Sequence, residues 1–186
     1  MNPHIQSNSP ELSANQNEKK LQSSLLISNN TNNSGFTKFS WIIFTLVVIL
    51  YIGSRLWRLT SYSLWTDEIF SVMAVRLSWN EMFIRLIMDK VHPPLFYIIL
   101  KLWVAIGGDS LLWLKLLPVL IASAAIIPFY GLCKELNLSA RTTNLTLLLM
   151  AVNGYLIYYS QEVRMYILLL FFTVASFWMF ARFVND

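Results

Sequence analysis

Charged side chains are scarce in this sequence of 186 residues. Only 13% of the residues are Asp, Glu, Lys or Arg, and 56% are hydrophobic. A soluble domain carries roughly 25% charged residues, and the mean hydropathy here is +0.53. The shortage of charge excludes an ordinary soluble domain. It predicts an all-α integral membrane protein.

Cysteine, histidine and concentrated positive charge are scarce too. Cys133 is the single cysteine, so an internal disulfide is excluded. No His and Cys spacing typical of a metal site is present, and we expect no cofactor; a divalent cation held by acids is a less favoured alternative. The net charge of +4 forms no compact basic patch. Nucleic-acid binding is therefore not expected.

The first 38 residues lack any long apolar run and are rich in Asn, Ser and Gln. This composition predicts a disordered polar tail over residues 1–38, on the cytoplasmic side. The tail is too long for the basic region of a signal peptide, and no small-residue cleavage site follows the first apolar run. That run is therefore expected to stay in the protein as a membrane helix.

Four apolar runs approach the length of about 20 helical residues that crosses a bilayer. We expect spans over residues 39–57, 111–133, 142–159 and 165–184. The two prolines inside the second run are tolerated in membrane helices. These spans predict a multi-pass protein of the plasma (inner) membrane.

Between the first two spans the pattern changes to three shorter helices, expected over about 67–76, 79–90 and 94–106. Ser78 and Glu81 form a capping-box signature, and apolar residues recur on one face of the helix that follows. Such an amphipathic helix is typical of the membrane interface. The last of the three, at roughly 18 Å, is too short to cross.

If residues 94–106 do not cross, the loop at 59–110 and the turn at 160–164 lie on the same side of the membrane. The basic residues that flank this loop argue against an outer location. Helix length and the polar residues described next favour it.

Two acidic residues directly follow the first span. Asp67 and Glu68 come after Thr66, which is a suitable N-cap, and acids in a first helical turn gain about 0.3–1 kcal/mol from the helix dipole. This structural role explains the pattern as well as a chemical role does. In the chemical interpretation, Asp67 stays ionised and acts as a base or a cation ligand.

Two further polar clusters interrupt the apolar sequence. His92 precedes Pro93 and Pro94, where its imidazole is either a solvated flanking group or a contact for a phosphate. Glu162 and Arg164 lie between two apolar helices with almost no loop between them. Ionisable residues at such depth are costly and indicate function, although these two residues are also able to pair with each other.

The acidic pair, the His-Pro-Pro-Leu motif and the later Tyr-Ser-Gln-Glu-Val-Arg-Met-Tyr motif together resemble the polyprenol-phosphate-dependent membrane glycosyltransferases. This family includes protein O-mannosyltransferases, aminoarabinose transferases and bacterial RgtA/B/C/D-like enzymes. The resemblance covers about residues 39–184 and implies a GT-C-like helix bundle with interfacial juxtamembrane helices in its first outer loop. Members are usually longer, so it implies the amino-terminal part of such an enzyme, the remainder belonging to a longer product or a separate partner chain.

The resemblance also implies an activity: transfer of a sugar from a polyprenyl-phosphate-linked donor to an acceptor at the outer face, with inversion of the anomeric carbon. It makes Asp67 the catalytic base, supported by Glu68. It places His92 near the donor phosphate, and Glu162 and Arg164 in the donor and acceptor pocket. The expected partners are the lipid-linked sugar, membrane lipids and an acceptor of unknown class.

Two other classes compete with this interpretation. One is a catalytically silent, truncated membrane subunit that keeps the fold without turnover. The other is a small transporter with Asp67 and Glu162 on an ion path. Acids on an ion path would lie near the middle of the bilayer, whereas these acids lie at segment ends, which disfavours the transporter.

Overall fold

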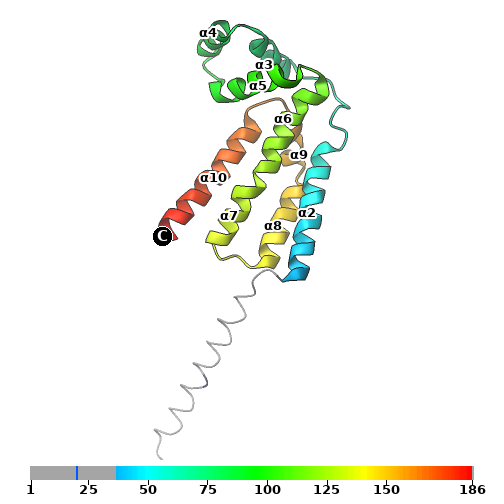
Figure 1. Cartoon of the computed structure of the whole chain (residues 1–186), viewed down its shortest axis with the longest axis vertical. Helices are drawn as coiled ribbons and strands as arrows, with labels where there is room; N and C mark the ends of the chain where they lie inside the picture. The colour runs from blue at the N-terminus through cyan, green and yellow to red at the C-terminus, as the bar shows by residue number, and fades with distance from the viewer. Residues whose placement is uncertain (1–19, 21–36, 186) are drawn as a thin grey trace, which may run out of the picture.

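The computed structural model describes Lys20 and residues 37–185, so the predicted disordered tail over 1–38 lies almost wholly outside the described residues. Every regular element in the described part is an α-helix (Figure 1). Three helices there are long and apolar enough to cross a membrane: Lys38–Leu56, Leu111–Glu135 and Tyr166–Asn185. The predicted all-helical class is confirmed, and these three helices correspond to three of the four predicted spans.

The long helices pack side by side as a bundle, and segments that follow each other in the sequence run in alternating directions (Figure 1). In chain order the bundle contains α2 (Lys38–Leu56), α6 (Leu111–Ala124) with α7 (Ile126–Glu135), α8 (Ala140–Val152) with α9 (Gly154–Gln161), and α10 (Tyr166–Asn185). α6 and α7 follow each other end to end, as do α8 and α9. Short connections join α7 to α8 at one end of the bundle and α9 to α10 at the other.

The fourth predicted span, 142–159, is divided between two helices rather than formed by one continuous helix. α8 has 13 residues and α9 has 8, so each is shorter than a bilayer crossing. The helix breaks at Asn153, whose side chain accepts a hydrogen bond from the Leu156 N–H at 3.0 Å. Asn competes well for backbone hydrogen bonds, and here it ends one helix and caps the next.

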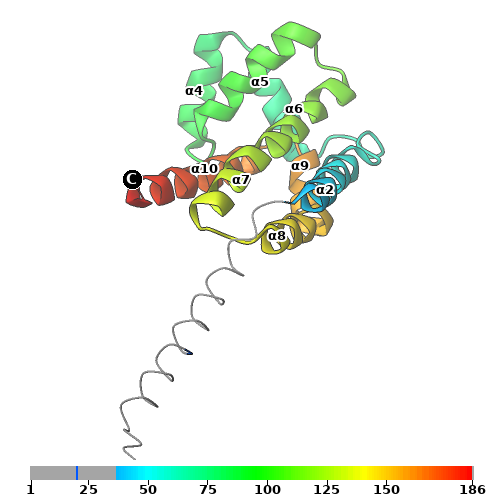
Figure 2. The ribbon, with the colours of Figure 1, turned by 60° about the horizontal axis from the view of Figure 1, so that its bottom comes forward.

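Three shorter helices lie together at one end of the bundle: α3 (Thr66–Arg76), α4 (Trp79–Asp89) and α5 (Pro94–Gly107). Figures 1 and 2 show them grouped at that end, with α5 lying across it rather than through the bundle. Their shared core includes the fully buried Met82, Phe96, Tyr97 and Leu100. The loop between the first two spans and the turn before α10 consequently lie at the same end of the molecule.

Local capping decides where the short helices begin. The Ser78 and Glu81 capping box is present: the Glu81 carboxylate accepts from the Ser78 N–H at 3.0 Å, and the Glu81 N–H donates to the Ser78 hydroxyl. Thr66, expected to be the cap of α3, is instead its first helical residue. The N-cap residue is Trp65, and the Glu68 carboxylate accepts a hydrogen bond from its backbone N–H at 2.8 Å.

A pair of tryptophans fastens α5 to α6. The rings of Trp103 and Trp113 stack with centroids 4.1 Å apart, and each indole N–H donates to the backbone carbonyl of the other. Gly107 makes room for this contact, because a Cβ there would come within 2.1 Å of the Trp113 ring. The stacked pair holds the short helices against the bundle.

Candidate active site

Two adjoining cavities open where the short helices meet the bundle. Both are lined by Trp65, Glu68, Tyr158 and Glu162. One, of about 310 Å³, adds Tyr62, Lys115 and Gln161, and we call it the Lys115 cavity. The other, of about 400 Å³, adds Thr66, Asp67, Tyr159, Arg164 and Tyr166, and we call it the Arg164 cavity. Four of the five predicted site residues thus line these two cavities.

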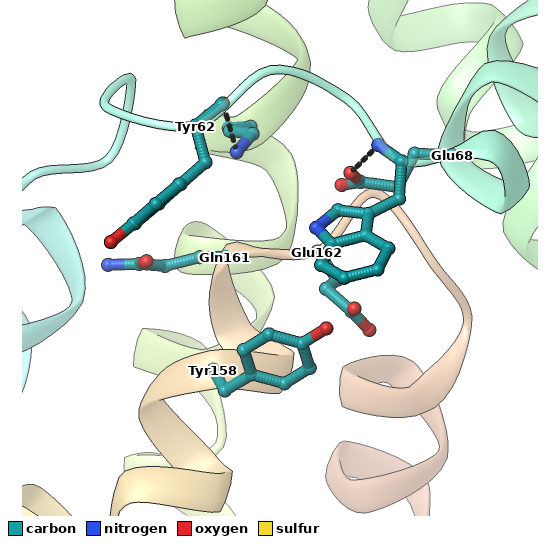
Figure 3. Close-up of a pocket in the computed structure, with 7 residues that line it drawn as sticks. Tyr62, Glu68, Tyr158, Gln161 and Glu162 are labelled. Carbon is teal, nitrogen blue, oxygen red and sulfur yellow. Dashed lines mark hydrogen bonds between the residues drawn. The ribbon is translucent and has the colours of Figure 1, made fainter.

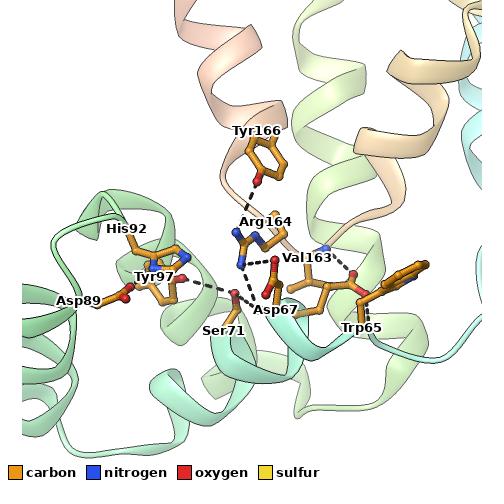
Figure 4. Close-up of polar contacts among 10 residues, drawn as sticks. Trp65, Asp67, Ser71, Asp89, His92, Tyr97, Val163, Arg164 and Tyr166 are labelled. Atoms are coloured by element: carbon orange, nitrogen blue, oxygen red, sulfur yellow. Dashed lines mark hydrogen bonds and ion pairs between the residues drawn. The ribbon is translucent and has the colours of Figure 1, made fainter.

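Glu68 connects the two sequence motifs that form the cavities. Its side chain is buried, with 1% of the residue exposed. One carboxylate oxygen accepts from the Trp65 N–H, and the other accepts from the Val163 N–H at 2.7 Å, across 95 residues of sequence (Figure 4). Because both oxygens hold backbone amides, Glu68 fixes the position of α3 against the link between α9 and α10.

Asp67 is arranged very differently from its neighbour. Its side chain is 74% exposed, and its Oδ2 lies 3.6 Å from Nη1 of Arg164, whose side chain is only 8% exposed. Arg164 also donates to the Asp67 backbone carbonyl at 3.3 Å and to the Tyr166 hydroxyl at 3.4 Å (Figure 4). An accessible carboxylate therefore lies beside a buried guanidinium.

The electrostatics keep this guanidinium charged. Burial acts to lower the pKa of Arg164, but the Tyr166 hydroxyl and the Asp67 carboxylate outweigh burial and raise that pKa. The cation is oriented by neighbours on both sides, since α3 supplies the aspartate and α10 supplies the tyrosine. Its Nε has no hydrogen-bond partner and lies in the interior.

Glu162 does not pair with Arg164, the alternative that the sequence allowed. Arg164 turns to Asp67, and the Tyr158 hydroxyl points toward the Glu162 carboxylate (Figure 3). Hydrogen bonding to Glu162 raises the pKa of Tyr158 to about 12. Tyr158 lies in α9, outside the three helices long enough to cross. Its phenol thus stays protonated at neutral pH and faces an ionisable acceptor.

His92 lies apart from both cavities. Its Nδ1 pairs with the Asp89 carboxylate, and its ring stacks on Phe70 at 5.1 Å and meets the edge of Tyr97 at 5.7 Å. It lines a separate cavity of about 610 Å³ between the end of α4 and the start of α5. Figure 4 shows His92, Asp89 and Tyr97 grouped together, apart from Asp67 and Arg164. The structure does not bring His92 to the predicted acids.

Sequence reasoning missed several residues that line the Lys115 cavity. Lys115 is buried, with 5% of the residue exposed, and its Nζ donates to the Tyr62 carbonyl at 2.9 Å. From sequence it was indistinguishable from a lysine that reaches the headgroups from a span end. Tyr158 and Gln161 had a detectable signal, because residues three apart in a helix share a face. Figure 3 shows Gln161 beside Tyr62, and Tyr158 beside Glu162.

Among the described residues, no group of three or more His, Cys, Asp or Glu is arranged to hold a metal ion. The chemical groups on offer are instead carboxylates, one guanidinium, one ammonium, phenols and an indole. Such a set is suited to proton transfer and to binding polyol and anionic groups.

Comparison of the chain with protein-family models, with curated proteins and with solved structures finds no match. Function is consequently argued from the chemistry of the two cavities.

Proposed function

We propose that this protein is a membrane glycosyltransferase that moves a sugar from a polyprenyl-phosphate-linked donor to an acceptor at the outer face of the plasma membrane. One observation carries the proposal: the accessible Asp67 carboxylate lies 3.6 Å from the buried Arg164 guanidinium. Together they offer a proton acceptor and an anion partner side by side. They do so at one end of a bundle of apolar helices, where a lipid-linked substrate meets water.

The reaction requires few groups. The acceptor hydroxyl gives its proton to Asp67, and its oxygen forms the new bond to the anomeric carbon from the face opposite the phosphate. The bond from that carbon to the phosphate oxygen breaks, and the polyprenyl phosphate leaves with the electron pair. Arg164 offsets the charge that develops on the leaving phosphate. A single displacement of this kind inverts the anomeric configuration.

The Lys115 cavity supports binding of a sugar. Its walls include the rings of Tyr62, Trp65 and Tyr158, and aromatic faces offer apolar surfaces against which the C–H face of a sugar packs. Glu162 accepts hydrogen bonds from hydroxyl groups, and the Lys115 ammonium has donors beyond the one bound to Tyr62. Pockets that combine apolar walls with a few polar groups are typical of small-molecule sites.

Two of the predicted residues take different roles in this proposal. Glu68 is a positioning residue, because both of its carboxylate oxygens hold backbone amides. Arg164 replaces His92 as the contact for the donor phosphate, since His92 is engaged by Asp89 away from the two cavities.

The test is a transfer assay with the full chain in membrane vesicles and a panel of polyprenyl-phosphate sugars. Asp67→Asn should lower the transfer rate by about 100-fold or more, the share that a general base typically supplies. Asp109→Asn is the matched control, because Asp109 also pairs with an arginine, Arg76, but lies outside both cavities. Absence of transfer by the parent chain with every donor contradicts the proposal and favours a catalytically silent membrane subunit.

A further inference from the structure

Arg55 is a fully buried cation near the end of α2, with 0% of the residue exposed. None of the ion pairs in the described part of the chain includes it. An ionisable residue within a membrane helix is costly and marks a functional position. The active-site chemistry proposed above does not use Arg55, so its burial requires another explanation.

Arg55 donates to polar groups of its own helix, the Tyr51 carbonyl and the Ser54 hydroxyl, and to one backbone carbonyl at the end of α8. Its Nη1 donates to the Tyr51 carbonyl at 2.8 Å within α2, and its Nη2 donates to the Met150 carbonyl at 3.3 Å. The neighbouring Ser54 hydroxyl donates to the Ala151 carbonyl at 3.1 Å. Met150 and Ala151 belong to the last turn of α8, where carbonyls lack partners within the helix and the dipole favours a cation.

Arg55 and Ser54 therefore occupy the carbonyls that the break at Asn153 leaves free. In an unbroken helix these carbonyls would accept hydrogen bonds from the following turn. Within a membrane, side chains of neighbouring helices have to replace such lost bonds. α2 provides that replacement at the level where α8 ends and α9 begins.

The same turn of α2 also holds the far end of α9. The Gln161 side-chain amide donates to the Arg55 carbonyl at 2.9 Å and to the Trp57 carbonyl at 3.1 Å. The end of α8 and the far end of α9 are thus both tied to α2. α9 carries Tyr158, and Glu162 follows it directly, so their positions in the cavities depend on this attachment (Figure 3).

Tyr51, one turn before Arg55 in α2, contacts the opposite wall of the Lys115 cavity. The Tyr51 hydroxyl donates to the Ala122 carbonyl at 3.1 Å, on the helix that carries Lys115. The Arg55 guanidinium lies against the Tyr51 ring. One turn of α2 consequently contacts both helices that face each other across the cavity.

We infer that Arg55 is a positioning residue: by binding the end of α8 it preserves the break at Asn153 and sets α9 so that Tyr158 and Glu162 face the cavities. The effect on catalysis rests on the proposed function. The effect on the position of α9 does not.

The position of α9 is measured with spin labels on the full chain in lipid nanodiscs. Cys133→Ala removes the native thiol, and cysteines replace the exposed Tyr155 on α9 and the exposed Met73 on α3. Electron–electron distance measurements should give one narrow distribution in this parent. Arg55→Met should broaden or shift it, and Arg55→Lys, which keeps a cation, should restore it in part. Arg182→Met removes an exposed arginine from the other end of the bundle and is the control.

Transfer kinetics of the same variants, made without the labels, supply the second readout. Arg55→Met should lower kcat by up to about 100-fold, the effect of a 1 Å misplacement, with little change in KM. If Arg55→Met does not fold, Ser54→Ala removes the hydroxyl that binds the Tyr51 and Ala151 carbonyls and accepts from Arg55, but keeps the guanidinium. It should produce a smaller shift of the same kind. An unchanged distance distribution in both variants overturns the inference. Absence of transfer in the parent counts against the proposed function instead, and the distances then decide the role of Arg55.

Discussion

Two aspartates at this end of the molecule pair with basic side chains, and the two pairs differ in what surrounds them. Asp67 and Arg164 come from segments 97 residues apart and meet at the mouth of a cavity. Asp89 and His92 are three residues apart and pack among the rings of Phe70 and Tyr97. The first pair depends on the whole fold and leaves an accessible carboxylate, whereas the second is a local contact at the end of a helix.

This difference shows where a site is expected in such a chain. A pair formed within one turn is explained by local structure alone. A pair that joins the first loop to the turn before α10 requires the bundle to hold both segments, and the same junction contains both cavities.

The largest loss of stability is expected on removal of Glu68, which joins α3 to the link between α9 and α10. Glu68→Ala should lower the free energy of unfolding by about 3 kcal/mol, because it leaves the buried Val163 N–H and the partly buried Trp65 N–H without their acceptor. The measurement is unfolding by SDS in mixed micelles. Glu81→Ala is the matched control, since Glu81 occupies the same capping position in α4 but is exposed, and its loss should be clearly smaller. Equal losses would mean that the junction contributes nothing beyond helix capping.

The next largest loss of stability is expected at the stacked Trp103–Trp113 pair, which joins α5 to α6. Gly107→Ala should destabilise the fold by about 1–3 kcal/mol, since its Cβ would overlap the Trp113 ring and force the stacked pair apart. The same unfolding experiment measures it. Gly53→Ala is the control, because nothing lies within 4 Å of a Cβ placed there. A neutral result at Gly107 would show that the tryptophan pair moves aside easily.

Loss of the Asp89–His92 contact should lower the free energy of unfolding least. Asp89→Asn should cost about 1 kcal/mol or less, because a partly exposed ion pair contributes little and the imidazole keeps its aromatic contacts. If Asp89→Asn destabilised the protein as much as Glu68→Ala does, the two regions would not differ as proposed.

The smallest effect is a change in titration. Glu162→Gln should lower the pKa of Tyr158 from about 12 toward its ordinary value of 10, because the carboxylate no longer favours the protonated phenol. The raised pKa stabilises the folded state below pH 10, and this contribution is lost as the pH rises through about 12. The tyrosinate absorbance of Glu162→Gln, with Tyr158→Phe as reference, measures the shift. An unchanged titration would show that Glu162 does not raise the pKa of Tyr158.

Much of the fold was predictable because long apolar runs are sufficient to identify helices that cross a membrane. The break at Asn153 was not, since one polar side chain that caps a helix leaves the hydropathy of the run almost unchanged. The partner of Arg164 was not predictable either, because the sequence offers Glu162 nearby and only the contact of α3 with the link between α9 and α10 brings Asp67 closer. The place of Lys115 in a cavity wall was not predictable for the same reason, because its contact with Tyr62 spans 53 residues.

The most direct test of the central claim compares Asp67→Asn with His92→Gln in the transfer assay. If Asp67 is the catalytic base, Asp67→Asn should lower the transfer rate by about 100-fold or more. His92→Gln should transfer at nearly the parent rate, with the same dependence on donor concentration. A large loss in His92→Gln together with near-normal transfer by Asp67→Asn would contradict the account and move the reaction to the region around α4 and α5.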